Sequence, residues 1–185
     1  MRLGYFALGL ITFRYAWGFV GTRYARFSSF VSAPWSAAKE LPELFHREPS
    51  SQVGHSKLGG WSILVLLVLV TIQATTGLFL TDDIFYSGPY NPAVSGDTAG
   101  LMAQIHRINF QVLQGFVVLH LLVIGWYAMG KRTNLVLPML TGHKATQTDQ
   151  AISGHKVALA VTLIIAVCFM VWLMLELAPE PVYAF

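Results

Sequence analysis

The sequence has few charged residues. Only 11% of its 185 residues are Asp, Glu, Lys or Arg, whereas 55% are hydrophobic. A soluble domain carries about 25% charged residues, which it uses to cover a surface that faces water. The scarcity of charge therefore excludes an ordinary soluble domain and favours a surface that faces lipid. The chain is long enough for one membrane domain, so we treat residues 1–185 as a single unit.

Cysteine is equally scarce. Cys168 is the one cysteine of the chain, and it lies inside an apolar run. A single cysteine cannot form an internal disulfide, and it cannot make a thiolate metal site alone. These two functions are excluded within one chain, and we predict that Cys168 is a small residue of the core.

Long hydrophobic runs, by contrast, are abundant. Four hydrophobic runs lie at about residues 3–20, 58–80, 105–129 and 157–177. Each is close to the ~20 residues that an α-helix needs to cross about 30 Å of hydrocarbon. Only helices and closed barrels can cross lipid, and these runs lack the strict alternation of barrel strands. The sequence therefore predicts an all-α integral membrane bundle with four transmembrane helices.

The few charges indicate a topology. Lys and Arg gather in segments 21–57 and 130–156, whereas segment 81–104 holds Asp but no Lys or Arg. Because basic loops stay in the cytoplasm, we expect cytoplasmic loops at 21–57 and 130–156 and a periplasmic loop at 81–104. The basic charge is then a topology signal, and we expect no nucleic-acid partner. The first helix would start on the periplasmic side, as if a preceding helix were missing.

Loop 21–57 combines aromatic residues, basic residues and three prolines. Trp and Tyr prefer the headgroup zone of a bilayer, where Arg meets anionic lipid. We expect this loop to be partly helical and to lie on the cytoplasmic surface of the membrane.

Two histidines lie in the third apolar run. His106 and His120 are fourteen residues apart, which on an α-helix corresponds to about 21 Å and nearly four full turns. Both imidazoles should therefore point into the bundle from one face, His106 near the periplasmic end and His120 in the cytoplasmic half. A bundle that holds two haems one above the other needs such a helix, because it gives each iron one axial imidazole. The alternative is two polar residues satisfied by neighbouring helices, and both readings stay open at this point.

The remaining histidines lie near the cytoplasmic surface. His46 and His143 fall in loops, and His55 and His155 each precede an apolar run. Such residues are usually solvated or bonded to backbone. Glycines flank His55 and allow a ligand to approach closely, so a quinone headgroup is a candidate there.

Two arginines lie where haem propionates would need a cation. Arg14 interrupts the first apolar run, and Arg107 is next to His106. A charge-assisted contact with a carboxylate would compensate a buried guanidinium. Solvation at the membrane interface is the alternative for Arg107, and snorkelling or contact with a protein partner is the alternative for Arg14.

Several stretches of the sequence carry a resemblance to a known family. They are residues 4–10, 13–21, 24–31, the motifs Gly54-His55 and Leu58-Gly59-Gly60, the pair His106 and His120, and residues 134–142. In these stretches the chain resembles the prokaryotic cytochrome b561 family, together with the related b-type subunits of nickel–iron hydrogenases and formate dehydrogenases. The resemblance covers nearly all of residues 4–144, and the fourth apolar run matches least well.

The resemblance implies a di-haem b cytochrome of the bacterial inner membrane. Such a protein passes electrons between the quinone pool and a periplasmic redox partner, such as a c-type cytochrome or another redox subunit. His106 would serve the periplasmic haem and His120 the cytoplasmic-side haem. The resemblance also implies an electron-transfer subunit without catalytic residues of its own, since the haem carries the chemistry.

The chain departs from the family pattern in its ligand set. Family members carry a haem-ligating histidine on an initial helix and another just before the stretch that matches Gly4-Tyr5, and neither is present here. The second axial ligands of one or two haems b are therefore not evident. Met170 and Met174 are near the level of His106, although methionine in a membrane helix is usually a packing residue. A gene start set too late, ligands from a partner chain, and loss of one or both haems are the three explanations.

The expected partners are membrane lipid, quinone, a periplasmic redox protein and, in a homodimer or larger complex, other subunits. A haem-depleted structural subunit of a larger redox or photosynthetic complex is the alternative function. A transporter is disfavoured, because the apolar runs show neither an inverted repeat nor paired broken helices.

Overall fold

Four long helices dominate a computed structural model of the chain. The structure describes residues 2–45, 56–82, 87–141 and 156–179. Within these residues, the helices that are long and apolar enough to cross a membrane are α1 (Arg2–Val20), α4 (Lys57–Gly77), α5 (Gly96–Met129) and α7 (Val157–Glu176). The described ranges contain no β-strand. The prediction of an all-α membrane bundle with four spanning helices is confirmed.

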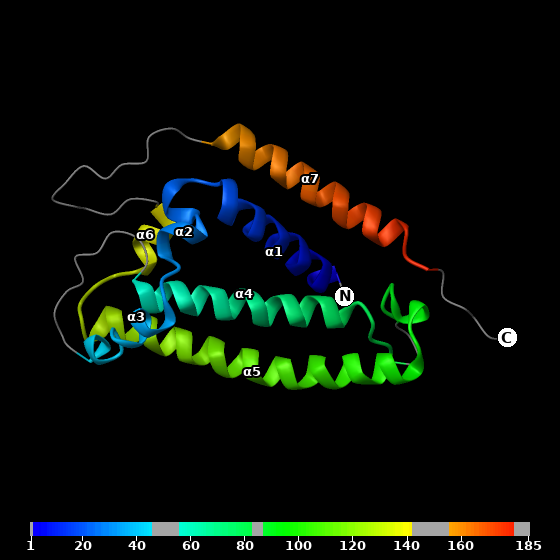
Figure 1. Cartoon of the computed structure of the whole chain (residues 1–185), viewed down its shortest axis with the longest axis horizontal. Helices are drawn as coiled ribbons and strands as arrows, with labels where there is room; N and C mark the ends of the chain where they lie inside the picture. Colours follow the sequence, from blue (N-terminus) through cyan, green and yellow to red (C-terminus); the bar gives the residue numbers. More distant parts are fainter. Residues whose placement is uncertain (1, 46–55, 83–86, 142–155, 180–185) are drawn as a thin grey trace.

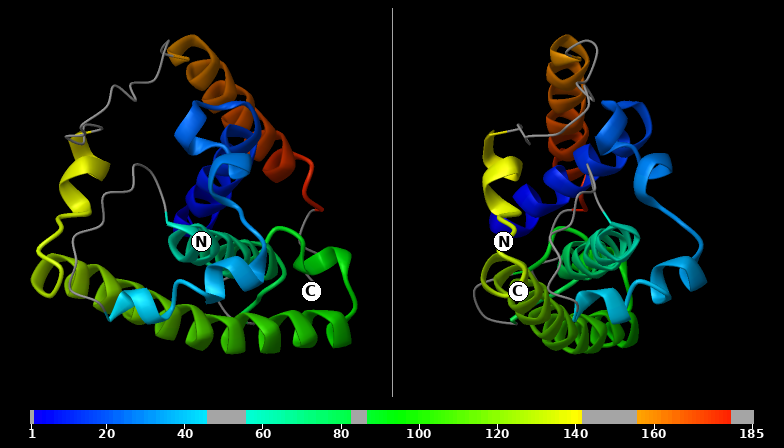
Figure 2. Two further views of the ribbon diagram at one scale, coloured as in Figure 1. Left: turned by 60° about the vertical axis from the view of Figure 1, so that its left-hand side comes forward. Right: turned by 90° about the vertical axis from the view of Figure 1, so that its left-hand side faces the viewer.

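The long helices lie side by side in the order α7, α1, α4, α5 (Figure 1). The contact between α4 and α5 is the most extensive, α1 packs on the other side of α4, and α7 packs on the outer side of α1. Figure 2 shows the same order from two further directions. Because α4 is the long helix on which α5 chiefly packs, the opposite face of α5 is exposed. Its exposed apolar side chains include Ile108, Phe110, Val112, Val118, Leu119 and Leu122.

In a bundle of four helices that lie side by side, many side chains face outward, and in a membrane these outward faces must be apolar because they contact lipid. Helix α7 is one example, because Val167 is its one buried residue. Cys168, next to it, is exposed. The prediction that Cys168 belongs to the core is wrong, because α7 packs on a single neighbour and has little core to offer.

Helix α5 begins at Gly96, before the apolar run that marks it in the sequence. Ser95 caps the helix, since its Oγ accepts a hydrogen bond from the backbone N–H of Thr98 at 3.3 Å. Asp97 in the first turn complements the helix dipole. The 34 residues of α5 would extend about 51 Å, longer than the hydrocarbon core is thick, so its polar first turns lie beyond the apolar span.

Short helices connect the long ones. They are η1 (Arg23–Ala25), α2 (Phe27–Phe30), α3 (Pro34–Ala38), η2 (Pro42–Leu44), η3 (Asn91–Ala93) and α6 (Val136–Thr141). The first four confirm that segment 21–57 is partly helical. They cover the start of α4, where Trp61 Nε1 donates to Ser32 O at 3.0 Å. Gly60 permits this closeness, because a Cβ there would be 2.5 Å from the backbone oxygen of Phe30.

Two hydrogen bonds fasten the ends of α7 to the rest of the bundle. At its start, Lys156 Nζ donates to Val20 O at the end of α1, at 2.7 Å. Near its end, Tyr90 Oη donates to Met174 O at 2.8 Å. Between them, a Cβ placed on Gly9 of α1 would lie 4.0 Å from the side chains of Val167 and Val171, so the two helices approach each other closely there. The helix is therefore tied to α1 and to the loop before α5, with α1 and α4 between it and α5.

Candidate functional site

His106 and His120 both lie on the face of α5 that packs against α4. Nδ1 of His106 is 3.0 Å from Oγ1 of Thr76, and Nδ1 of His120 is 3.3 Å from Oγ of Ser62. The prediction that one face carries both imidazoles is confirmed. Ser62 and Thr76 are also fourteen residues apart, the same spacing as the two histidines. Each imidazole thus has its own hydroxyl partner on the antiparallel neighbouring helix.

A chain of amide hydrogen bonds leads to the other nitrogen of His106. Nδ2 of Asn109 donates to Leu69 O at 2.9 Å and to Oε1 of Gln73 at 2.7 Å. Because a backbone carbonyl can only accept, this contact fixes which amide atom of Asn109 is nitrogen, and hence which atom of Gln73 is oxygen. Nε2 of Gln73 is then a donor, and it lies 2.7 Å from Nε2 of His106. His106 therefore accepts a hydrogen bond at Nε2.

The contact between Thr76 and Nδ1 of His106 leads to the same protonation state of the ring, with Nε2 unprotonated. Oγ1 of Thr76 donates its proton to Ile72 O at 2.6 Å, within its own helix. The hydroxyl oxygen is then an acceptor toward the ring, so Nδ1 of His106 carries the proton. His106 is a neutral imidazole whose two nitrogens are both satisfied by α4. Asn109, with 7% of its surface exposed, and Thr76, with 6%, bury this polar chain between the helices.

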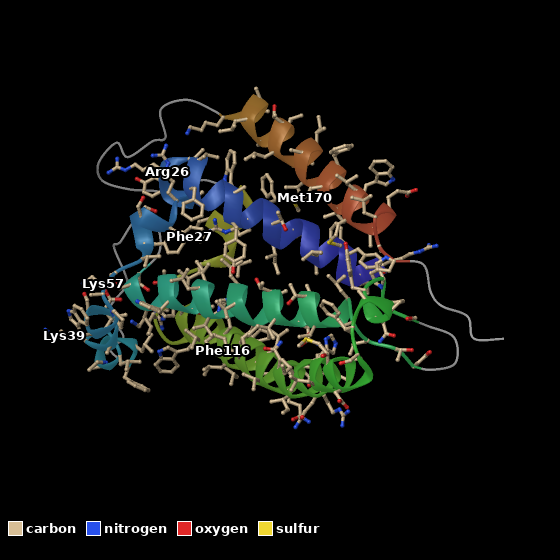
Figure 3. The ribbon with its side chains drawn as sticks, turned by 45° about the vertical axis from the view of Figure 1, so that its right-hand side comes forward. Arg26, Phe27, Lys39, Lys57, Phe116 and Met170 are labelled. Atoms are coloured by element: carbon tan, nitrogen blue, oxygen red, sulfur yellow. The ribbon has the colours of Figure 1, made fainter. Side chains whose placement is uncertain are left out.

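Within the part of the chain that the structure describes, His120 is hydrogen-bonded at one nitrogen. Nδ1 faces Ser62, and Nε2 makes no hydrogen bond to any residue within the described ranges. Figure 3 shows the side chains between α4 and α5 and labels Phe116, one turn before His120. The two histidines thus differ in the state of Nε2, the nitrogen that a metal would use.

A family model described as prokaryotic cytochrome b561 matches residues 1–142. The chain belongs to this family. The match extends from α1 through α6, includes both histidines and leaves out α7. The chain is therefore a multi-pass membrane b-type cytochrome that transfers electrons, and its family implies b-type haem. Searches of curated proteins and of solved structures found no match.

The histidines of this cytochrome fit haem unequally. A ligating histidine normally presents one ring nitrogen to the metal and holds the other N–H against an acceptor, which fixes the ring and raises the basicity of the ligand. His120 fits this pattern, with Nδ1 at Ser62 and Nε2 open. His106 has the matching Nδ1 contact at Thr76, but Gln73 occupies its Nε2. As arranged, the structure fits an iron at His120 and does not fit one at His106.

Arg14 is used within the cytochrome's own fold. Its Nη1 donates to Ala25 O at 3.0 Å, and its guanidinium lies over the rings of Phe27 and Phe30, at 5.2 and 5.8 Å from their centroids. These contacts compensate the half-buried charge and fasten α1 to the short helices. They do not bring Arg14 to either histidine, so its role as a propionate partner stays a prediction.

Two further candidate residues, Arg107 and His55, are not shown in contact with either histidine. Arg107 is exposed on α5 and turns about 100° away from His106 around the helix axis. His55 lies outside the described residues, as do His46, His143 and His155. The roles of Arg107 and His55 in binding propionate and quinone remain predictions.

The methionines of α7 do not supply a ligand to His106 in this arrangement. Figure 3 shows Met170 on α7, on the far side of α1 from α5, and 44% of its surface is exposed. Met174 lies on the same helix, where its backbone oxygen accepts the Tyr90 hydroxyl. Since α1 and α4 separate α7 from α5, a second axial ligand from α7 is not provided.

Sequence reasoning missed four polar residues of the site: Ser62, Gln73, Thr76 and Asn109. A signal for two of them was present. Ser62 and Thr76 repeat the fourteen-residue spacing of the histidines inside an apolar run, where a hydroxyl needs a partner. Nothing comparable marked Gln73 and Asn109, because their pairing depends on the register of α4 against α5.

Replacing Ser62 by Ala tests the hydroxyl contact at His120. We expect haem affinity to fall about tenfold, as is typical when the outer partner of a ligating histidine is removed. The midpoint potential should rise, because a ligand that loses an Nδ1–H acceptor becomes less basic and stabilises ferric iron less. Redox titration and low-temperature electron paramagnetic resonance would measure the potential and the ring orientation. Thr75→Ala is the control, since the exposed Thr75 hydroxyl bonds only its own helix; equal effects of both variants would contradict the assignment.

Proposed function

We propose that this cytochrome transfers electrons between the quinone pool of the bacterial inner membrane and a periplasmic redox partner. The observation that supports it best is the matched pair of contacts Ser62–His120 and Thr76–His106, which orients two imidazoles at two depths on one helix. Their fourteen-residue separation corresponds to about 21 Å along α5, so haems held at both histidines would lie at two different depths of the bilayer.

The residues of the chain bind and orient, and the cofactor does the redox chemistry. When bound, haem b supplies a one-electron ferric–ferrous couple. His120 would hold it through Nε2, Ser62 would fix the plane of the imidazole, and the apolar side chains of α4 and α5 would exclude water. Nothing in the chain needs to make or break a covalent bond during transfer.

The partners follow from the proposed orientation. The basic segments 21–57 and 130–156 would face the cytoplasm and anionic lipid, and a quinone would bind at that side, near His55. A c-type cytochrome or another redox subunit would dock at the periplasmic side. The exposed apolar face of α5 would contact lipid, a second copy or a larger complex.

One observation favours a second candidate function. Both ring nitrogens of His106 are hydrogen-bonded to protein side chains without any cofactor. This is what we expect of a histidine that only packs, as in a haem-depleted structural subunit. Haem content separates this candidate from electron transfer.

A dithionite-reduced minus oxidised spectrum, with haem-to-protein stoichiometry, tests the proposal on the purified full chain in detergent. We expect the α-band of a b-type haem, reduction by a short-chain quinol and reoxidation by an added c-type cytochrome. A chain that contains no haem and takes up none when haemin is added would establish the structural subunit instead. Haem that no quinol reduces would contradict the quinone part of the proposal alone.

A further inference from the structure

The two imidazoles differ at the nitrogen that iron would bind. Nε2 of His120 is open toward the described residues, whereas Nε2 of His106 accepts a hydrogen bond from Gln73 at 2.7 Å. The hydroxyl contacts on the Nδ1 side are alike in kind. The difference between the two sites therefore comes from one residue of α4, Gln73.

Gln73 is held in place by its own partner. Its Oε1 accepts from Asn109, and Asn109 also donates to Leu69 O, so the carboxamide is fixed between a buried residue and the ring. A polar group that loses its partner between apolar helices is destabilised, so leaving Asn109 and His106 would cost the Gln73 amide free energy. The contact with His106 is part of a fully paired chain.

The ring of His106 lies close to the backbone of α4. A Cβ placed on Gly77 would lie 3.4 Å from Cε1 of His106, which shows how closely the backbone of α4 approaches the imidazole. Thr76 holds Nδ1 on the adjacent side. An iron that is to bind Nε2 must therefore displace the Gln73 amide.

We infer that Gln73 is a specificity-determining residue that competes with haem iron for Nε2 of His106, so that the His120 site binds haem more tightly than the His106 site. The inference rests on the proposed function, since it concerns haem binding by the same histidines. Binding at His106 requires the Gln73 contact to break and leaves the amide to find another partner. Binding at His120 requires no such exchange.

Gln73→Met tests the competition, because methionine keeps the length of the side chain and removes both amide atoms. In the background of His120→Ala, His106 is the histidine of the described residues that remains to bind haem. Haemin titration of the purified chain, followed by absorbance, should show about tenfold tighter binding when Gln73 is replaced, the upper end of what one net hydrogen bond provides. Gln111→Met is the matched control, since Gln111 is exposed on α5 about 140° and 180° around the axis from the two histidines.

The possible outcomes separate the inference from the proposed function. Unchanged or weaker binding in Gln73→Met, with haem bound by the unsubstituted chain, would overturn the inference and leave the proposed function intact. Absence of haem from the unsubstituted chain and from every variant would contradict both the inference about Gln73 and the proposed function.

A second measurement does not depend on the folding of any variant. In the haem-free, unsubstituted chain with ¹⁵N-labelled histidine, the ring shifts of His106 should show a proton on Nδ1 and none on Nε2. A proton on Nε2 would overturn the inference, because that nitrogen could not then accept from Gln73.

Discussion

Replacing His120 by Ala should remove most of the b-type haem from this cytochrome. His120 is the histidine of the described residues whose Nε2 is open, and among those residues its loss leaves only the imidazole of His106, whose Nε2 already accepts from Gln73. Removing the outer partner of a ligating histidine costs about 10- to 100-fold in metal affinity, and loss of the ligand itself should cost at least as much. Haem content, measured as the pyridine haemochrome per protein, should fall by at least about tenfold.

His106→Ala is the matched comparison. It removes the same side chain from the same face of α5, fourteen residues away, and should lower haem content much less. Both proteins need to be compared after equal haemin addition, with the helical content of each checked by circular dichroism. A larger loss in His106→Ala than in His120→Ala would contradict the assignment of the main site to His120.

Replacing Asn109 by Leu should produce the largest loss of stability among the site variants. The amide of Asn109 is buried and joins Leu69 O to Oε1 of Gln73, so its removal leaves an unpaired amide oxygen between two apolar helices. We expect the free energy of unfolding to fall by about 1.5 kcal/mol, which is near the lower end of the range for a buried polar group that loses its partner and near the upper end for polar contacts between membrane helices. Polar contacts between membrane helices are often weaker, about 0.6 kcal/mol on average, because the separated helices find other partners.

Denaturation of the purified chain in mixed detergent micelles would measure this loss. Gln111→Leu removes a comparable amide from an exposed position of the same helix and should change stability little. The double variant Asn109→Leu with Gln73→Met should be less destabilised than the sum of the single variants, since both act on one chain of hydrogen bonds. Strict additivity would show that the two amides are not coupled.

The helices were predictable because each depends on a local property of the sequence. The runs near 3–20, 58–80 and 157–177 are predominantly apolar, and the structure places helices α1, α4 and α7 there. The early start of α5 depends on different information, a serine cap and an acidic first turn, which hydrophobicity does not report. A search for helix-capping residues would have predicted the start of α5 from Ser95 and Asp97.

Only part of the site could be predicted in the same way. The shared face of His106 and His120 follows from helix periodicity, a property of one element. The roles of Gln73 and Asn109 depend on how α4 and α5 are aligned, and no pattern within either helix fixes that alignment. The position of Arg14 shows the same limit, because its partners Ala25, Phe27 and Phe30 belong to a segment whose path does not follow from periodicity.

The polar chain around His106 begins and ends on main-chain carbonyls of α4, at Leu69 and Ile72. Its interior links are two carboxamides, a neutral imidazole and a hydroxyl whose proton is already donated. Carboxamides do not readily pass a proton onward, and neither end offers a group that could take one up from water. The chain is therefore a poor proton wire. In a membrane protein that transfers electrons, this part of the α4–α5 contact can therefore carry polar side chains between the helices without offering protons a path.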